Sequence, residues 1–161
     1  EMVDGLVGSE MCIRDRLYVT HDQAEATTLA DKIGVLKEGH LVQIGTPEEI
    51  YENPNSIYVS QRLGSPKINI LPGTLLGMND VPTFGIRPEN ITIGNGNHSA
   101  KIISIENLGS ETVVALNFKD QEILVSIQGN YKSSINETIN FDINNAKVLK
   151  FDQEGNRIYE R

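Results

Sequence analysis

The feature that most constrains the fold is the run of short apolar segments that follows Pro66. These segments recur at about ten-residue spacing, separated by glycine, asparagine and aspartate, which favour turns. Apolar and polar side chains alternate in residues 101–105 and again in residues 123–127, as in strands with one buried face. Short, evenly spaced strands of this kind predict an all-β domain over residues 65–161, folded as a small closed or nearly closed barrel.

Residues 17–64 have a different, mixed pattern. The apolar run LYVT at residues 17–20 predicts a short strand buried on both faces of a mainly parallel sheet. Asp22 and Glu25, three residues apart, predict the capped start of a helix. The helix face expected to turn inward carries the apolar side chains of Ala26, Leu29, Ala30 and Ile33.

A hairpin and two further helices are expected in the rest of this segment. The strands KIGVL and LVQIG flank a tight turn at Gly39. Thr46 is suited to cap the next helix, with Pro47 at its first position and Asn53 before the proline that ends it. The last short helix is expected to end at Gly64.

Residues 17–64 are not expected to form a complete domain. Three strands and two or three short helices over about fifty residues bury too little apolar surface to be stable alone. A buried parallel strand also needs neighbouring strands, which this chain does not encode. The segment therefore reads as an α/β fragment, followed by the all-β domain.

The first sixteen residues show neither helical nor alternating periodicity. The string MCIRDR back-translates to DNA that resembles, read in frame, the transposon-end adapter used to prepare sequencing libraries. We therefore expect residues 1–16, including Cys12, to be a non-native scar, with a frayed native terminus as the alternative.

Composition excludes several classes of function. The net charge of −8 disfavours nucleic acid as a partner, because a phosphate-backbone binder usually carries a positive surface. The single cysteine excludes an internal disulfide and a cysteine-based zinc site, and the three histidines are not at metal-ligand spacing, so no metal site is expected. A cytosolic protein is the default expectation.

His21 is the candidate for chemistry. It follows the expected strand and precedes the expected helix, and ligands of open α/β sheets bind at the carboxyl ends of the strands. An imidazole there can donate to a phosphate oxygen or hold a water molecule. A lone His-Asp pair is common, however, so local spacing leaves a simple surface histidine as an open alternative.

A longer string carries a specific resemblance. The residues YVTHDQAEATTLADKI, GTPEEIYENP and GSPKINILPG resemble the end of the nucleotide-binding domain of ABC importer ATP-binding subunits. The similar class is that of sugar and glycerol-3-phosphate importers, including the maltose-importer type. FGIRPENITI and ENLGSETVVALNF resemble the transport-associated OB (TOBE) domain of the same subunits. The resemblance runs from Leu17 almost to the end of the chain.

This resemblance implies a role for one residue and several partners. His21 matches the switch histidine, which contacts the γ-phosphate of ATP, so it is both the catalytic and the cofactor-binding candidate. ATP and Mg²⁺ are implied for an intact subunit, as are a homodimer, membrane permease subunits and a cytoplasmic location against the inner face of the membrane. Asp22, Gln23 and Glu25 match the motif too, and are expected to serve in capping, loop geometry and packing.

The resemblance also has gaps. The sequence contains no G-x-x-x-x-G-K-[ST] phosphate loop, no Ser-Gly-Gly signature segment and no strand ending in Asp-Glu. We therefore expect a truncated subunit that neither binds ATP tightly nor hydrolyses it alone. The solute is left as a sugar or glycerol-3-phosphate.

Two other functions stay open. The chain could be a free-standing OB-type module that binds a small ligand or regulates a partner without ATPase activity. An OB nucleic-acid binder is the second, which the acidic balance disfavours. For the triplet Arg87-Pro88-Glu89, the alternatives are a contact within the domain or across a dimer, and a strand end with partly exposed polar contacts.

Overall fold

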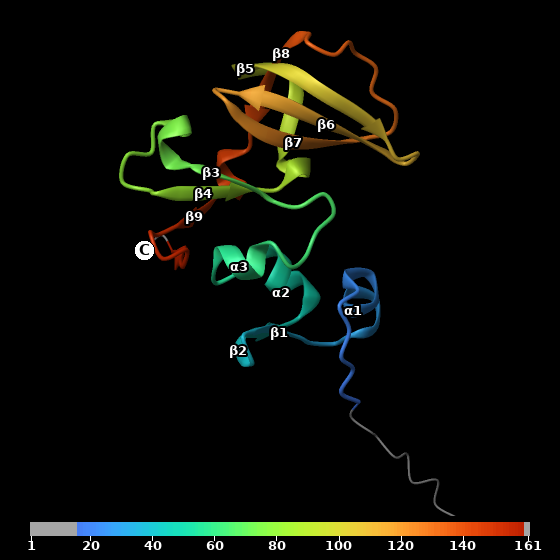
Figure 1. The fold of residues 1–161 in the computed structure, drawn as a ribbon, viewed down its shortest axis with the longest axis vertical. Helices are drawn as coiled ribbons and strands as arrows, with labels where there is room; N and C mark the ends of the chain where they lie inside the picture. Colours follow the sequence, from blue (N-terminus) through green and yellow to red (C-terminus); the bar gives the residue numbers. More distant parts are fainter. Residues whose placement is uncertain (1–15, 160–161) are drawn as a thin grey trace, which may run out of the picture.

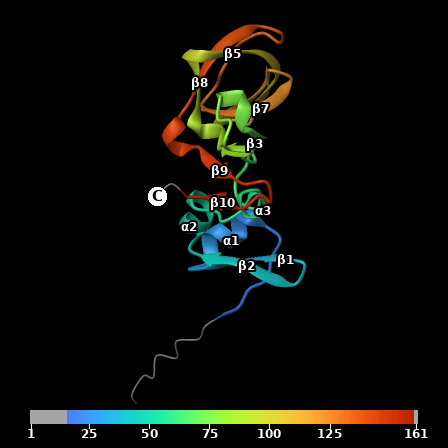
Figure 2. The ribbon, with the colours of Figure 1, turned by 90° about the vertical axis from the view of Figure 1, so that its left-hand side faces the viewer.

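The computed structural model describes residues 16–159. It is elongated, with the helices and a hairpin of the N-terminal segment at one end and two β-sheets above them (Figures 1 and 2). The expected scar lies almost wholly outside the described residues. All strand pairs within residues 16–159 are antiparallel.

The N-terminal segment, residues 16–64 of the described chain, contains three short helices and one hairpin. Its elements are α1 (Gln23–Leu29), β1 (Ile33–Lys37), β2 (His40–Gly45), α2 (Pro47–Glu52) and α3 (Ile57–Ser60). Their inward-facing side chains form a small cluster of their own, built around Ile33, Val35, Ile50, Val59 and Leu63.

The hairpin and α2 confirm the sequence prediction. The β1–β2 turn holds Gly39 at a φ of 81°, in the left-handed region that favours glycine. Thr46 accepts a hydrogen bond from the Glu49 amide, and the Glu49 carboxylate accepts one from the Thr46 amide, which completes a capping box. Asn53 follows as the C-terminal cap, as expected.

Three local predictions are wrong. Residues 17–20 form no strand, and Leu17 and Val19 are 95% and 83% exposed. A parallel strand needs neighbours, and no parallel pair exists among the described residues to supply them. Helix α1 ends at Leu29, whose side chain is 72% exposed, so only Ala26 and Ala30 of the expected face join Ile33 in the cluster. Helix α3 ends at Ser60, a turn before Gly64, where Gln61 caps it.

The rest of the described chain forms two four-stranded sheets that share a main core. One sheet has the order β10-β9-β4-β3 and the other β7-β6-β5-β8. The strands are β3 (Asn69–Pro72), β4 (Thr83–Ile86), β5 (Ile91–Asn107), β6 (Glu111–Phe118), β7 (Gln121–Gln128), β8 (Thr138–Ile143), β9 (Leu149–Phe151) and β10 (Arg157–Ile158). Short 3-10 turns η1 (Gly73–Leu76), η2 (Pro88–Asn90) and η3 (Asn145–Lys147) join them.

The core of this region draws on both sheets. Phe84 and Ile86 of β4 are fully buried against Ile102 of β5, Leu116 of β6 and Phe141 of β8. Such a mostly β arrangement is consistent with the OB-type domain that the sequence resemblance implies. An α/β piece with parallel strands is not found in residues 16–159.

The C-terminal end of the described chain returns to the N-terminal segment. The amide of Ile57 donates to Gly155 O at 2.8 Å, and the amide of Arg157 donates to Asn55 O at 2.8 Å. Ile57 also packs on a small cluster that contains Leu149 and Phe151. Segments about a hundred residues apart in the sequence are thus joined.

Candidate functional site

His21 lies in a short exposed stretch immediately before α1. The bend at His21 is held by the residues on either side of it. Thr20 Oγ1 accepts from the Asp22 amide at 3.0 Å and donates to Glu25 Oε2 at 2.8 Å. Asp22 Oδ1 accepts from the amides of Ala24 and Glu25 at 2.8 and 3.1 Å. The backbone at His21 is therefore fixed even though no strand precedes it.

The expected capping role of Asp22 is confirmed, with one difference. In a regular capping box the Glu25 carboxylate would accept from the Asp22 amide, whereas here Thr20 takes that amide and passes a hydrogen bond to Glu25. Gln23 Oε1 accepts from the Gly64 amide at 3.0 Å, which ties the start of α1 to the end of the α3 loop. Asp22, Gln23 and Glu25 thus serve in helix capping and in holding the loops together, as the sequence predicts.

The His21 imidazole itself points to no partner. It is exposed, and no hydrogen bond joins it to another residue of the described part of the chain. The other two histidines are engaged: His40 Nδ1 lies 3.0 Å from Glu38 O, and the His98 ring packs between Phe118 and Phe141. His21 is thus the histidine best placed to contact an external group.

The fit to ATP and magnesium is partial. His21 can donate to one phosphate oxygen. Within residues 16–159, no group of three or more His, Cys, Asp or Glu side chains lies close enough to hold a metal ion. The described residues therefore offer a single phosphate contact, without a cradle of backbone amides around it.

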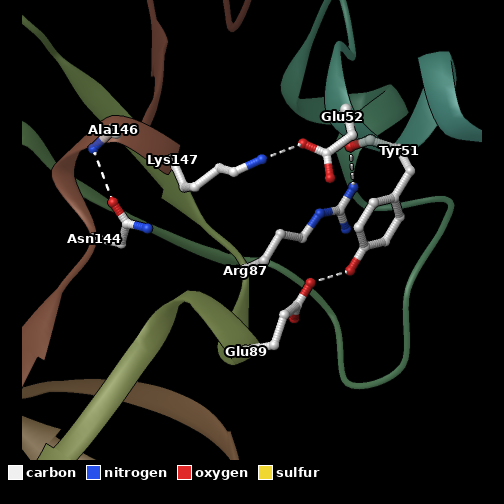
Figure 3. A network of polar contacts seen from close by, with 7 residues as sticks. All are labelled: Tyr51, Glu52, Arg87, Glu89, Asn144, Ala146 and Lys147. Carbon is white, nitrogen blue, oxygen red and sulfur yellow. Dashed lines mark hydrogen bonds and ion pairs between the residues drawn. The ribbon is translucent and has the colours of Figure 1, made fainter.

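A second constellation lies at the junction between the N-terminal segment and the sheets (Figure 3). The guanidinium of Arg87, at the end of β4, reaches into the N-terminal segment. Its Nη1 donates to Ser60 O at 3.1 Å and to Leu63 O at 2.6 Å, and its Nη2 donates to Tyr51 O at 2.9 Å. The Tyr51 ring stacks on it, with 3.8 Å between the guanidinium carbon and the ring centroid.

Arg87 corrects one of the sequence interpretations. The side chain is only 4% exposed, so it is not the partly exposed polar contact of a strand end. Its hydrogen-bond partners are backbone carbonyls, whose oxygens satisfy the buried N–H donors without adding a second buried charge. The contact lies within the chain, between its two parts.

Tyr51 and Lys147 extend this junction, and sequence reasoning missed both. The Tyr51 hydroxyl donates to Glu89 Oε1, and Lys147 Nζ lies 3.0 Å from Glu52 Oε2. Local pattern gives no signal for either pair, because their partners are 38 and 95 residues away.

Burial shifts the acidity of the two stacked groups. It lowers the pKa of Arg87, although the nearby Tyr51, Glu89 and Glu52 partly oppose the change. Burial, together with the hydrogen bond to Glu89, raises the pKa of the Tyr51 hydroxyl well above its ordinary value. The tyrosine therefore stays neutral and acts as a donor.

No described helix has the length and hydropathy that crossing a membrane requires.

Comparison with known proteins identifies relatives for both parts of the chain. Residues 84–150 match the TOBE domain family. The chain is 34% identical over 171 residues to an sn-glycerol-3-phosphate import ATP-binding protein of Psychromonas ingrahamii, which covers 89% of this chain and 46% of that protein. It is 31% identical over 169 residues to an alpha-glucoside transport ATP-binding protein of Rhizobium meliloti, covering 86% and 47%.

A third relative is also an import ATP-binding protein. A xylose/arabinose import ATP-binding protein of Haloferax volcanii is 36% identical over 130 residues, covering 65% of this chain and 34% of that protein. The chain thus spans less than half the length of these curated relatives. The resemblance of the sequence to the ATP-binding subunits of sugar and glycerol-3-phosphate importers is thus confirmed.

Proposed function

We propose that this chain, whose residues 84–150 are a TOBE domain, is the C-terminal part of the ATP-binding subunit of an ABC importer. The observation that carries the proposal is the alignment with ATP-binding import proteins, which extends beyond the TOBE domain to 89% of the chain. Residues 17–64 would then be the end of the nucleotide-binding domain, and residues 65–161 the OB-type regulatory domain.

An exposed apolar face supports this assignment independently. In the β1–β2 hairpin the pairs Gly34–Ile44 and Leu36–Leu41 face away from the cluster under the hairpin. The side chains of Leu36, Leu41 and Ile44 are all exposed on this face. Contiguous apolar surface of this kind marks an interface. We propose that the preceding part of the nucleotide-binding domain covers it.

His21 is the residue through which this chain would act on the nucleotide. Bound ATP with Mg²⁺ supplies the phosphoryl group that is transferred to water. The His21 imidazole would hold an oxygen of the γ-phosphate, in a reaction governed by positioning and electrostatics. The hydrogen bonds of Thr20 and Asp22 fix the backbone that carries this ring.

Solute, partners and location follow from the same proposal. The relatives' names point to sugars and to sn-glycerol-3-phosphate, so we propose one of these as the imported solute. The intact subunit would work as a homodimer on membrane permease subunits at the cytoplasmic face. The described residues alone are expected to hydrolyse no ATP.

The apolar face gives a direct test. The chain alone should bind the dye 1-anilinonaphthalene-8-sulfonate, and a Leu41→Lys, Ile44→Lys variant should bind much less. Leu108→Lys with Ile135→Lys, at exposed apolar positions in the TOBE region, is the matched control and should change little. Fusing the upstream part of the Psychromonas ingrahamii relative ahead of Leu17 should also suppress dye binding. Unchanged dye binding in that fusion would contradict the proposed cover.

A further inference from the structure

An open cleft of about 730 Å³ lies where the TOBE region meets the N-terminal segment. It is lined by Tyr51 of α2, by η2 and the start of β5, and by the end of β7 with the facing start of β6. This volume lies within the range of small-molecule pockets, about 300–1,000 Å³. Tyr51 and Glu89 of the Arg87 junction border the cleft, whereas His21 is not among the described lining residues.

The chemistry of the lining is selective. Glu89 and Glu111 bring carboxylates, Gln128 an amide, and Ser126 a hydroxyl, beside the rings of Tyr51 and Tyr131. Isoleucines of β5 and β7 supply apolar surface between these polar groups. No lysine, arginine or histidine is among the described lining residues. Such a site repels phosphate and other oxyanions and offers acceptors to hydroxyl groups.

The polar groups are held in place before any ligand arrives. Ser126 Oγ donates to Glu111 Oε2 at 2.6 Å, and Tyr51 donates to Glu89 Oε1. The second oxygen of each carboxylate has no hydrogen bond to a described residue. Each is therefore available as an acceptor from a fixed position, which lowers the entropic cost of binding.

Tyr131 is also fixed, through a buried threonine. The fully buried Thr112 donates to Gly129 O at 2.7 Å and accepts from the Tyr131 amide at 3.1 Å. The segment that leaves β7 is thereby held against β6. Its tyrosine ring can cover the apolar face of a sugar while the carboxylates take the hydroxyl groups.

We propose that this cleft binds a neutral polyhydroxylated small molecule, a sugar or a polyol, and excludes anions. Carboxylates, an amide, aromatic rings and isoleucine side chains match a ligand with hydroxyl edges and C–H faces. Because Tyr51 belongs to α2 and Tyr131 to the TOBE region, the ligand contacts both parts of the chain. The site does not depend on the proposed ATPase role, so either can fail without the other.

Titration calorimetry on the whole chain tests the proposal. The neutral probes are glucose, xylose, maltose and glycerol; sn-glycerol 3-phosphate and sulfate are the anionic probes, and spermidine is the cationic one. At least one neutral probe should bind saturably, while the charged probes should not. The proposal is overturned if none of the four neutral probes binds, or if an anion or spermidine binds more tightly than all of them.

Two variants locate the binding. Glu111→Gln replaces a charged acceptor and should weaken the bound neutral probe about tenfold or more. Gln128→Ala removes an exposed side chain, which folding does not need, and should weaken it about two- to tenfold. Glu154→Gln, exposed on the β9–β10 turn and outside the cleft, is the control and should bind normally. Normal affinity in both cleft variants would place the ligand elsewhere and overturn the assignment.

Discussion

At the scale of single residues, Arg87 is the clearest case of a side chain whose surroundings explain it. Its charge is almost fully buried, yet three carbonyl oxygens and one aromatic face surround it. Only its Nε is buried without a hydrogen-bond partner among the described residues. A buried cation satisfied in this way holds two segments together, because removing it leaves several acceptors without donors.

Replacing Arg87 should therefore destabilise the whole fold. Arg87→Met keeps much of the side-chain volume but strands three carbonyl groups, so we expect the free energy of unfolding to fall by about 3 kcal/mol. The measurement is a urea denaturation curve. Arg62→Met is the control, because Arg62 is exposed and stacks on Tyr58. Equal losses of stability in the two variants would contradict the proposal that the contacts of Arg87 hold the two segments together.

Tyr51 predicts a pH dependence at the alkaline end. Its pKa is raised in the folded state, whereas a tyrosine in the unfolded chain ionises at about pH 10. The stabilisation is thus complete below about pH 10 and is lost above it, where the unfolded chain releases the proton more readily. The urea midpoint should fall more steeply above about pH 10 in the wild type than in Tyr51→Phe. Tyr159→Phe, at an exposed position, should keep the wild-type slope.

At the scale of elements, α2 depends on its cap. The helix has only six residues, so its two reciprocal hydrogen bonds at Thr46 and Glu49 are a large share of its local support. Thr46→Ala should lower the free energy of unfolding by about 1 kcal/mol. Thr28→Ala, exposed in α1, is the matched control. Equal urea midpoints for the two variants would show that packing of Ile50 alone sustains the helix.

Local elements such as α2 and the β1–β2 hairpin are the part of the fold that the sequence predicts. The Thr46 cap, the Gly39 turn and the evenly spaced strands are local patterns, so they can be predicted from the sequence without tertiary information. The expected strand at residues 17–20 failed because a strand's existence depends on neighbours. The contacts of Arg87 with Tyr51 and Ser60 were invisible, because no local pattern links residues 27 or 36 positions apart. For His21, the resemblance is visible in the sequence, whereas the exposed ring and the hydrogen bonds on either side of it are seen only in the structure.

At the scale of the whole molecule, the two parts of the chain are joined at several points. Arg87 enters the N-terminal segment, Lys147 pairs with Glu52, and residues 155–157 bond to residues 55–57. The ion pair is half-exposed and contributes little, whereas the buried contacts carry most of the connection. Movement of α2 should therefore reach the TOBE region, as the regulatory role proposed for that region requires.

The role proposed for His21, a contact with the γ-phosphate of ATP, can be tested directly. The measurement is the ATPase rate of a fusion in which the upstream part of the Psychromonas ingrahamii relative precedes Leu17, compared with its His21→Ala and His40→Ala variants. We expect the fusion to hydrolyse ATP, His21→Ala to lose about a hundredfold or more of the rate while still binding ATP, and His40→Ala to keep the rate unchanged. A folded fusion that binds ATP without hydrolysing it, or a His21→Ala rate equal to that of His40→Ala, would contradict it.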